Sequence, residues 1–193
     1  MRNFSIKIIL LFLVCAFTPS AFGQRIAVPA EYQAELIPRI IQMNKNFTST
    51  NDTINIGIYY SSYLDLSSGA KKSIVNFFEN RSHEKNNFAY RIFVIDAANI
   101  PVENLKSILM RHGISVLYIA PLRSINYSVI RDICRERKIF SISANPDLVE
   151  TYFTLSFDLV NDKIKIIVNL NSARMENVNF SAYLLKVARI IDD

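Results

Sequence analysis

Short apolar runs alternate with longer amphipathic segments along most of the chain. Four runs are rich in β-branched and aromatic residues with few polar positions, which is typical of strands buried on both faces of a sheet. A helix over residues 29–46 precedes the first strand and contains Pro38, where we expect a kink or a helix restart. The predicted strands span residues 54–60, 88–95, 114–120 and 139–143.

Three amphipathic segments connect these strands, with apolar residues three to four positions apart. Ser67 is the predicted N-cap of the first helix and Ser124 that of the third. Pro101 and Gly113 bound the second helix, because proline favours a helix start and glycine a helix end.

The C-terminal part of the chain has a different pattern. Two partly alternating strands, 152–160 and 164–170, are separated by the polar residues 161–163, which predicts an antiparallel hairpin. A final helix is predicted from one apolar stripe, which is formed by Phe180, Leu184, Leu185, Ala188 and Ile191.

Alternation of strands and helices predicts parallel strand pairing through right-handed crossovers. We therefore predict a three-layer α/β fold: a mostly parallel sheet of about six strands, helices on both faces and a C-terminal antiparallel hairpin. No internal repeat or linker divides the chain, so residues 24–193 are predicted to form one domain.

Residues 1–23 have the three-part pattern of a secretory signal peptide. Arg2 and Lys7 precede ten uncharged apolar residues, and small residues follow, with predicted cleavage between Gly23 and Gln24. The alternative is an uncleaved anchor, but the apolar run is half the length of about 20 residues that a membrane span needs. We predict a periplasmic protein.

Net charge and cysteine content argue against two features, nucleic-acid binding and an internal disulfide. Removal of residues 1–23 lowers the net charge from +5 to +3, and the densest basic run, Arg131 to Lys138, is interrupted by Asp132 and Glu136. This pattern is typical of a solvated helix face, so no nucleic-acid partner is predicted. Cys134 is then the only cysteine, which excludes an internal disulfide, and its position on an apolar helix face predicts burial.

Candidate chemistry is sparse. The three remaining glycines are scattered, which argues against a nucleotide site, and the sequence has no G-x-S-x-G and no metal-binding motif. His83 and His112 have sequence contexts that favour structural roles. We therefore predict no catalytic residue, no cofactor and no metal. In a parallel sheet, ligands bind beyond the carboxyl ends of the strands. Those loops contain Ser61, Ser62, Asp96, Pro121, Arg123, Ala144, Asn145 and Pro146.

Tyr59, Tyr60 and Tyr63 cluster at the end of the first predicted strand. Tyrosine is a frequent anchor in protein contacts, but residues 59 and 60 lie within a strand, where packing explains them. For Tyr63 the contact and packing interpretations both stay open.

Residues 165–190 (KIIVNLNSARMENVNFSAYLLKVARI) resemble the closing segment of the YfiR-like family of exported bacterial proteins. Looser similarity reaches upstream to about residue 30, whereas glycines that family members often carry before the strand at 152–160 are absent here. Because apolar members of the signature would bury against the sheet, we interpret it as structural. The matching residues are Asn169, Leu170, Ala173, Arg174, Phe180, Ser181, Leu184 and Leu185.

The resemblance implies a non-enzymatic regulator that restrains a membrane-anchored signalling protein. The implied partner is a diguanylate cyclase, with control of cyclic-di-GMP and biofilm formation. A sensor kinase is the other partner that we consider, and a homodimer is expected. Two alternatives stay open. The first is a periplasmic small-ligand sensor or solute-binding module, and the second is a hydrolase with a site assembled from His83, His112 and Cys134.

Overall fold

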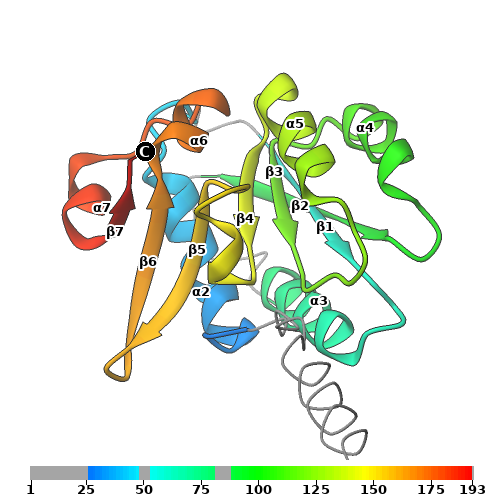
Figure 1. Cartoon of the computed structure of the whole chain (residues 1–193), viewed down its shortest axis with the longest axis horizontal. Coiled ribbons are helices and arrows are strands. Elements are labelled where there is room, and N and C mark those ends of the chain that lie inside the picture. Colours follow the sequence, from blue (N-terminus) through cyan, green and yellow to red (C-terminus); the bar gives the residue numbers. More distant parts are fainter. Residues whose placement is uncertain (1–25, 48–52, 81–87, 193) are drawn as a thin grey trace, which may run out of the picture.

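The computed structural model describes residues 26–47, 53–80 and 88–192. They contain a seven-stranded sheet with the strand order β2-β1-β3-β4-β5-β6-β7 (Figure 1). All neighbouring strands are parallel except β5 and β6. The strands are β1 (Thr53–Tyr60), β2 (Ala89–Asp96), β3 (Val116–Ile119), β4 (Phe140–Ser143), β5 (Leu155–Val160), β6 (Lys163–Asn169) and β7 (Arg189–Ile191).

Helices cover both faces of the sheet, which confirms the three-layer prediction. The helices are α2 (Ala30–Gln42), α3 (Asp65–Asn80), α4 (Val102–Arg111), α5 (Tyr127–Arg137), α6 (Leu170–Met175) and α7 (Ala182–Val187), with a 3₁₀ turn at Pro146–Leu148. Helices α2 and α3 share one core cluster with alternate strand residues such as Ile56 and Tyr118. Helices α4 and α5 share the other with Tyr59 and Leu117.

Two predicted helix starts are wrong. Helix α3 begins at Asp65, two residues before Ser67, whose hydroxyl instead accepts a hydrogen bond from the Ser61 N–H at 2.9 Å. Helix α5 is capped by Asn126, whose side chain accepts from the Ser128 N–H, whereas Ser124 lies upstream with a left-handed φ of 54°.

The first predicted helix is shorter than expected: α2 ends at Gln42 rather than at residue 46, and it continues through Pro38 without a restart. The boundaries of α4 agree with the prediction. Pro101 is the N-cap of α4, and Gly113 follows its end with a φ of +57°, a left-handed conformation that glycine adopts without steric cost.

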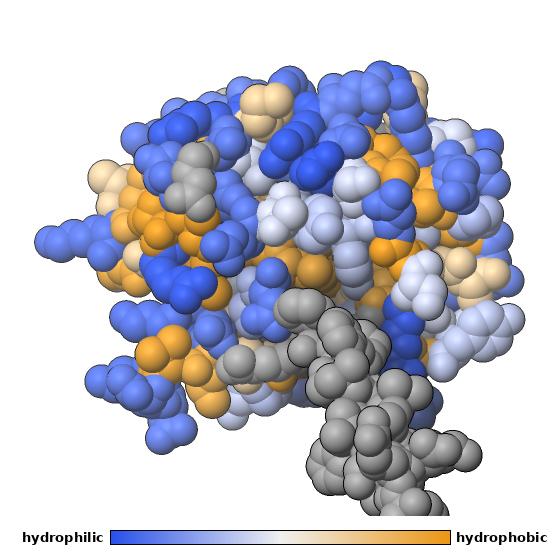
Figure 2. Space-filling model, viewed as in Figure 1, coloured by the Kyte–Doolittle hydropathy of each residue, from blue (hydrophilic) through white to orange (hydrophobic). Residues whose placement is uncertain are grey.

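The predicted hairpin is present. Asn161 and Asp162 both have positive φ, which suits a two-residue turn between twisted antiparallel strands. The exposed ends of these strands carry Leu159, Val160 and Ile164. Figure 2 accordingly shows hydrophobic surface over the hairpin, surrounded by hydrophilic residues.

The predicted final helix is wrong in its second half. Helix α7 ends at Val187, and Arg189–Ile191 form β7, which pairs in parallel with β6 and supplies the seventh strand. The edge of β6 offers backbone partners to these residues, and the two isoleucines suit a strand. The apolar stripe is therefore divided between a six-residue helix and a strand at the sheet edge. The short helix α6 was also missed.

Candidate functional site

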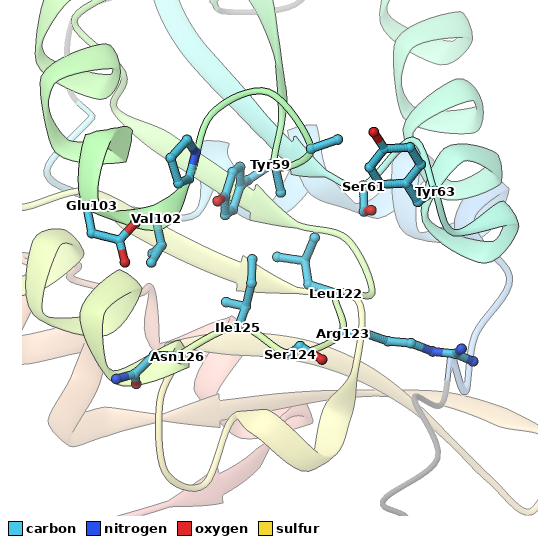
Figure 3. A pocket seen from close by; sticks show the side chains of 13 residues that line it. Tyr59, Ser61, Tyr63, Val102, Glu103, Leu122, Arg123, Ser124, Ile125 and Asn126 are labelled. Carbon is cyan, nitrogen blue, oxygen red and sulfur yellow. The ribbon is translucent and has the colours of Figure 1, made fainter.

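A cavity of about 560 Å³ opens at the carboxyl edge of β1, β2 and β3 (Figure 3). The connection after β1 leads to β2 on one side, whereas the connection after β3 leads to β4 on the other side, so the strand order reverses between β1 and β3. Ligands of open α/β sheets bind in the crevice at such a topological switch point. Of the predicted loop residues, Ser61 and Arg123 line this cavity, together with residues from the start of α4. Those not lining it are Ser62, Asp96, Pro121, Ala144, Asn145 and Pro146.

The cavity floor is formed by buried and mostly apolar side chains. Tyr59 is fully buried in the core, and its hydroxyl donates to the Ile100 carbonyl oxygen at 3.1 Å. Burial raises the pKa of Tyr59 to about 12, with smaller contributions from the carboxylates of Glu103 and Asp96. The hydroxyl therefore stays neutral and already has an acceptor. Val102 and Leu122 complete the buried lining.

Asp96 organises the neighbouring loops. Its Oδ1 accepts hydrogen bonds from the Ser62 and Ala98 N–H groups at 3.1 and 3.0 Å. Burial by itself raises the pKa of this carboxyl, but these bonds and those from the Ser62 and Tyr60 hydroxyls outweigh it, so the pKa lies below its usual value. Asp96 thus anchors these loops as a carboxylate that accepts their backbone hydrogen bonds.

The cavity rim, in contrast, carries exposed side chains. Tyr63, from the loop between β1 and α3, is 88% exposed. Figure 3 shows Tyr63 and Arg123 on one side of the cavity and Glu103, from the first turn of α4, on the other. All three are exposed, and none has a hydrogen-bond or ion-pair partner among the described residues. We refer to these three residues as the rim.

The candidate nucleophile and bases do not meet in this cavity. Cys134 is a free, fully buried thiol on α5, as predicted, and burial raises its pKa well above the usual value. His112 ends α4 and stacks against the Phe93 ring at 4.6 Å between centroids. His83 lies outside the described residues, as does the predicted signal peptide with Gly23 and Gln24. Within residues 26–47, 53–80 and 88–192, no cluster of three potential metal ligands occurs.

Most signature residues in the C-terminal segment contact the core. Ala173, Phe180 and Leu184 are buried, and the Phe180 ring packs edge-on against Phe140. Leu170 and Leu185 are half-buried against the same cluster.

The polar signature residues serve the turns of this segment. The Asn169 side chain accepts from the Ser172 N–H and donates to the Val149 carbonyl oxygen at 3.0 Å, so it caps α6 and holds the loop before β5. Ser181 caps α7. Arg174 does not bond backbone groups in the turn; it pairs with Asp192 on the surface.

Glu176 is a buried ionisable residue that the sequence analysis missed. It is 1% exposed, and its carboxyl accepts hydrogen bonds from the Ser141 N–H, the Ser141 hydroxyl and the Thr154 hydroxyl at 2.8, 2.7 and 2.6 Å. Burial raises its pKa to about 7, although these bonds and the Arg135 charge limit the rise. A single acidic residue in a polar turn gives no sequence signal of burial.

This carboxyl lies where the sheet is most weakly joined. Only Ile142 and Leu155 pair between β4 and β5. Side chains replace the missing ladder: Glu176 accepts from Ser141, and the Ser141 hydroxyl accepts from the Thr154 N–H at 2.9 Å. The Ser156 hydroxyl donates to the Ser143 carbonyl oxygen. We call this side-chain network the β4–β5 join.

The sequence matches the model of a known protein family. The family model DUF4154, described as YfiR/HmsC-like, matches residues 45–189. The chain belongs to the YfiR/HmsC-like family. Membership of the YfiR/HmsC-like family suggests a periplasmic regulatory role and confirms the resemblance drawn from the C-terminal signature. No curated protein matches the sequence.

Several solved structures share the fold at low sequence identity. The ABC domain from Streptococcus pneumoniae in complex with L-Trp has a TM-score of 0.57 at 15% identity, covering 84% of this chain and 62% of that structure. CD0873, a substrate binding protein with adhesive properties from Clostridium difficile, has a TM-score of 0.56 at 15% identity, covering 86% and 60%. A conserved domain protein from Vibrio cholerae O1 biovar El Tor has 0.53 at 14%, covering 85% and 60%.

These likenesses show that the chain shares its α/β fold with the three structures. The YfiR/HmsC-like chain spans about three fifths of the length of each structure. Among its described helices, none is long and apolar enough to cross a membrane.

Proposed function

We propose that this protein is a periplasmic, non-enzymatic regulator that restrains a membrane-anchored signalling protein, such as a diguanylate cyclase or a sensor kinase. The observation that carries the proposal is the family match over residues 45–189. We further propose that residues 1–23 direct export and are cleaved between Gly23 and Gln24.

The described surface supports contact with another protein better than it supports catalysis. The thiol of Cys134 is buried with a raised pKa, so it is a poor nucleophile, and His112 is stacked on an aromatic ring away from the cavity. The rim offers an exposed tyrosine and two charges, which are residue types that anchor and orient protein contacts.

The test is a gene deletion with complementation. Loss of the protein should raise cyclic-di-GMP and surface attachment if the partner is a diguanylate cyclase, and expression of the wild type should restore both. Crosslinking in intact cells followed by affinity capture should recover an integral membrane protein with an extracytoplasmic domain. Unchanged cyclic-di-GMP together with no such captured protein would contradict the proposal. A recovered sensor kinase with unchanged cyclic-di-GMP would identify the other partner class.

A second candidate function is small-ligand sensing in the carboxyl-edge cavity. The specific observation is its volume of about 560 Å³ at the switch point, within the range of about 300–1,000 Å³ typical of ligand pockets. A ligand bound at 100 times its Kd stabilises the folded state by about 2.7 kcal/mol, which a thermal-shift screen of metabolites detects. An absence of any shift across such a panel would remove this candidate.

A further inference from the structure

Strand β2 forms one edge of the sheet, and β7 forms the opposite edge (Figure 1). Strand β2 has eight residues and pairs along its whole length with β1, whereas β7 has three residues. Folded proteins usually protect an edge strand by short length, proline, lysine or a covering segment, because its free N–H and C=O groups bind other strands. Strand β7 is short, but β2 is long and contains neither proline nor lysine.

One hydrogen bond at the end of β2 shows which of its backbone groups face outward. In a parallel pair, alternate residues direct their N–H and C=O groups toward the same neighbour. The Ala97 N–H donates to the Tyr60 carbonyl oxygen at 2.7 Å, which places the odd-numbered residues of β2 toward β1. Tyr90, Ile92 and Val94 therefore direct their N–H and C=O groups away from the sheet. No other part of the described chain hydrogen-bonds to these groups.

The side chains along this edge are mostly apolar. Tyr90 and Ile92 are half-buried against one core cluster, and Phe93 is half-buried against the other. Val94 is 48% exposed, which is the largest exposure of any large apolar residue in the described strands. β-branched and aromatic residues pack well against the side chains of a neighbouring strand. The edge thus offers an added strand apolar contacts as well as backbone partners.

Arg91 determines which charge an added strand should carry. It is exposed on this edge, and it has no ion-pair partner in the parts of the chain that the structure describes. Opposite charges on neighbouring strands attract, whereas like charges directly opposite are destabilising. The other charged residue of β2, Asp96, already accepts hydrogen bonds from the Ser62 and Ala98 N–H groups. The edge therefore favours a strand with aspartate or glutamate beside Arg91.

We propose that the outer edge of β2 is a strand-addition site, which binds an extended segment of another protein as an additional strand of the sheet. The segment carries apolar side chains at alternate positions and an acidic residue beside Arg91. Binding of this kind takes its affinity from backbone hydrogen bonds and its specificity from alternate side chains. The inference goes beyond the proposed regulation of a membrane protein and does not rest on it. Its test needs only purified protein and peptides, so its failure is distinguishable from failure of the proposed function.

The experiment selects binders from a phage-displayed library of random octapeptides, with the purified protein as the target. Selected peptides are synthesised, and their Kd is measured by fluorescence anisotropy. We expect the enriched sequences to alternate β-branched or aromatic residues with polar ones and to contain aspartate or glutamate. Binding should slow hydrogen exchange at the amides of Tyr90, Ile92 and Val94, because the added strand accepts hydrogen bonds from them.

Val94→Pro is the discriminating variant. Proline removes an outward-facing N–H and fills the space beside it, but it leaves the hydrogen bonds between β2 and β1 in place. The variant should weaken peptide binding about tenfold or more. Val94→Thr keeps both the N–H and a β-branched side chain, so it is the matched control and should bind as the wild type does. Phe93→Pro removes a hydrogen bond to β1 instead and should destabilise the fold.

Two further measurements do not depend on how Val94→Pro folds. Peptides N-methylated at every second amide lose the donors on one of their edges only. One methylated set should therefore lose binding to the wild-type protein, while the other set retains it. Arg91→Glu should shift the selected sequences from acidic to basic residues, whereas Arg39→Glu at an exposed position on α2 should leave them unchanged.

Three results would overturn the proposal. Failure to enrich any peptide on the wild type over Val94→Pro removes the site. Loss of binding with both N-methylated sets, or with neither, excludes pairing along a strand edge. Slowed exchange confined to residues outside β2 moves the bound peptide to another surface. Far-ultraviolet circular dichroism of each variant separates loss of binding from loss of folding.

Discussion

Polar side chains at the carboxyl edge of the parallel strands differ from those at the β4–β5 join in burial and in hydrogen bonding. At the join, Glu176 is buried and its carboxyl accepts three hydrogen bonds. At the edge, Tyr63, Arg123 and Glu103 are exposed and have no such partners among the described residues. Groups of the first kind hold the fold together, whereas groups of the second kind are available to another molecule.

This difference means that the residues by which the family is identified are not the residues that we expect to bind a partner. The signature that resembles the family lies around the join and the elements after it, where packing and capping constrain residue identity. The rim lies in loops and a first helical turn, where little in the fold constrains it. The segment that reveals the family is therefore a different segment from the one we expect to make contacts, and the following predictions test that division.

The largest effect is expected in the signature. Phe180→Ala should lower the free energy of unfolding by about 3–5 kcal/mol, because it leaves a cavity beside Phe140 in a packed core. Urea denaturation measures this. Tyr183→Ala in the same segment, at a 69% exposed position, is the control and should change stability by less than about 0.5 kcal/mol. Equal effects of the two substitutions would contradict a structural role for Phe180.

The next largest effect is a pH dependence of stability that originates from Glu176 at the β4–β5 join. The carboxyl of Glu176 ionises near its ordinary pKa of 4.5 in the unfolded chain but only near 7 in the folded protein. The folded state therefore holds a proton that the unfolded state has lost, and stability falls as pH rises from about 4.5 through 7. Linkage gives a contribution of about 3 kcal/mol, which is fully present below pH 4.5.

Glu176→Gln is the variant that isolates this contribution. The amide does not titrate, so the variant should lack the decline between pH 4.5 and 7 that denaturation of the wild type shows. Glu150→Gln, at an exposed position, should retain it. If wild type and Glu176→Gln have parallel pH profiles, the carboxyl of Glu176 is not the titrating group.

A smaller effect on stability is expected at a buried hydrogen bond between β3 and α2. The Tyr118 hydroxyl donates to Gln33 Oε1 at 3.1 Å, and both side chains are fully buried. Tyr118→Phe removes the donor and should cost about 1–2 kcal/mol of stability, because the amide oxygen is left without a partner. Chemical denaturation measures it, and Tyr32→Phe on the exposed surface is the neutral control. A neutral Tyr118→Phe would show that this bond contributes nothing.

The smallest effect on stability is expected at the rim. Tyr63→Ala and Arg123→Glu should each change the free energy of unfolding by less than about 0.5 kcal/mol, since neither side chain is buried. Thermal unfolding of dilute protein measures this without a contribution from association. A large loss of stability would show that these rim residues are structural, as those of the β4–β5 join are, and would contradict the distinction between the two regions.

The sequence was informative wherever periodicity decided the structure. Apolar runs predicted the four parallel strands, and the Pro101 and Gly113 signals predicted α4. The tail was mispredicted because its apolar spacing fits a helix, while pairing with the edge of β6 is a tertiary effect that local pattern does not contain. The Ser124 cap was wrong for a related reason: Asn126 is an equally good cap, and only the loop geometry selects it.

The site was predictable only in part. Strand-end loops pointed to Ser61 and Arg123, since parallel strands bring their carboxyl ends together. Glu103 was missed because it lies inside a helix, and its place on the rim follows from the direction in which α4 leaves the loop. Glu176 was missed because its burial depends on Ser141 and Thr154, which are distant in sequence.

The first helix sets a practical limit on how this protein can be shortened. The family match starts at residue 45, yet α2 ends before that point and supplies buried side chains to the sheet, among them Ile37, Ile40 and Ile41. Gln33 reaches from the same helix to Tyr118 in β3 and to the carbonyl of Val28. A fragment cut at the family boundary would leave one sheet face without part of its cover and invite aggregation, so expression boundaries for this protein belong upstream of Val28.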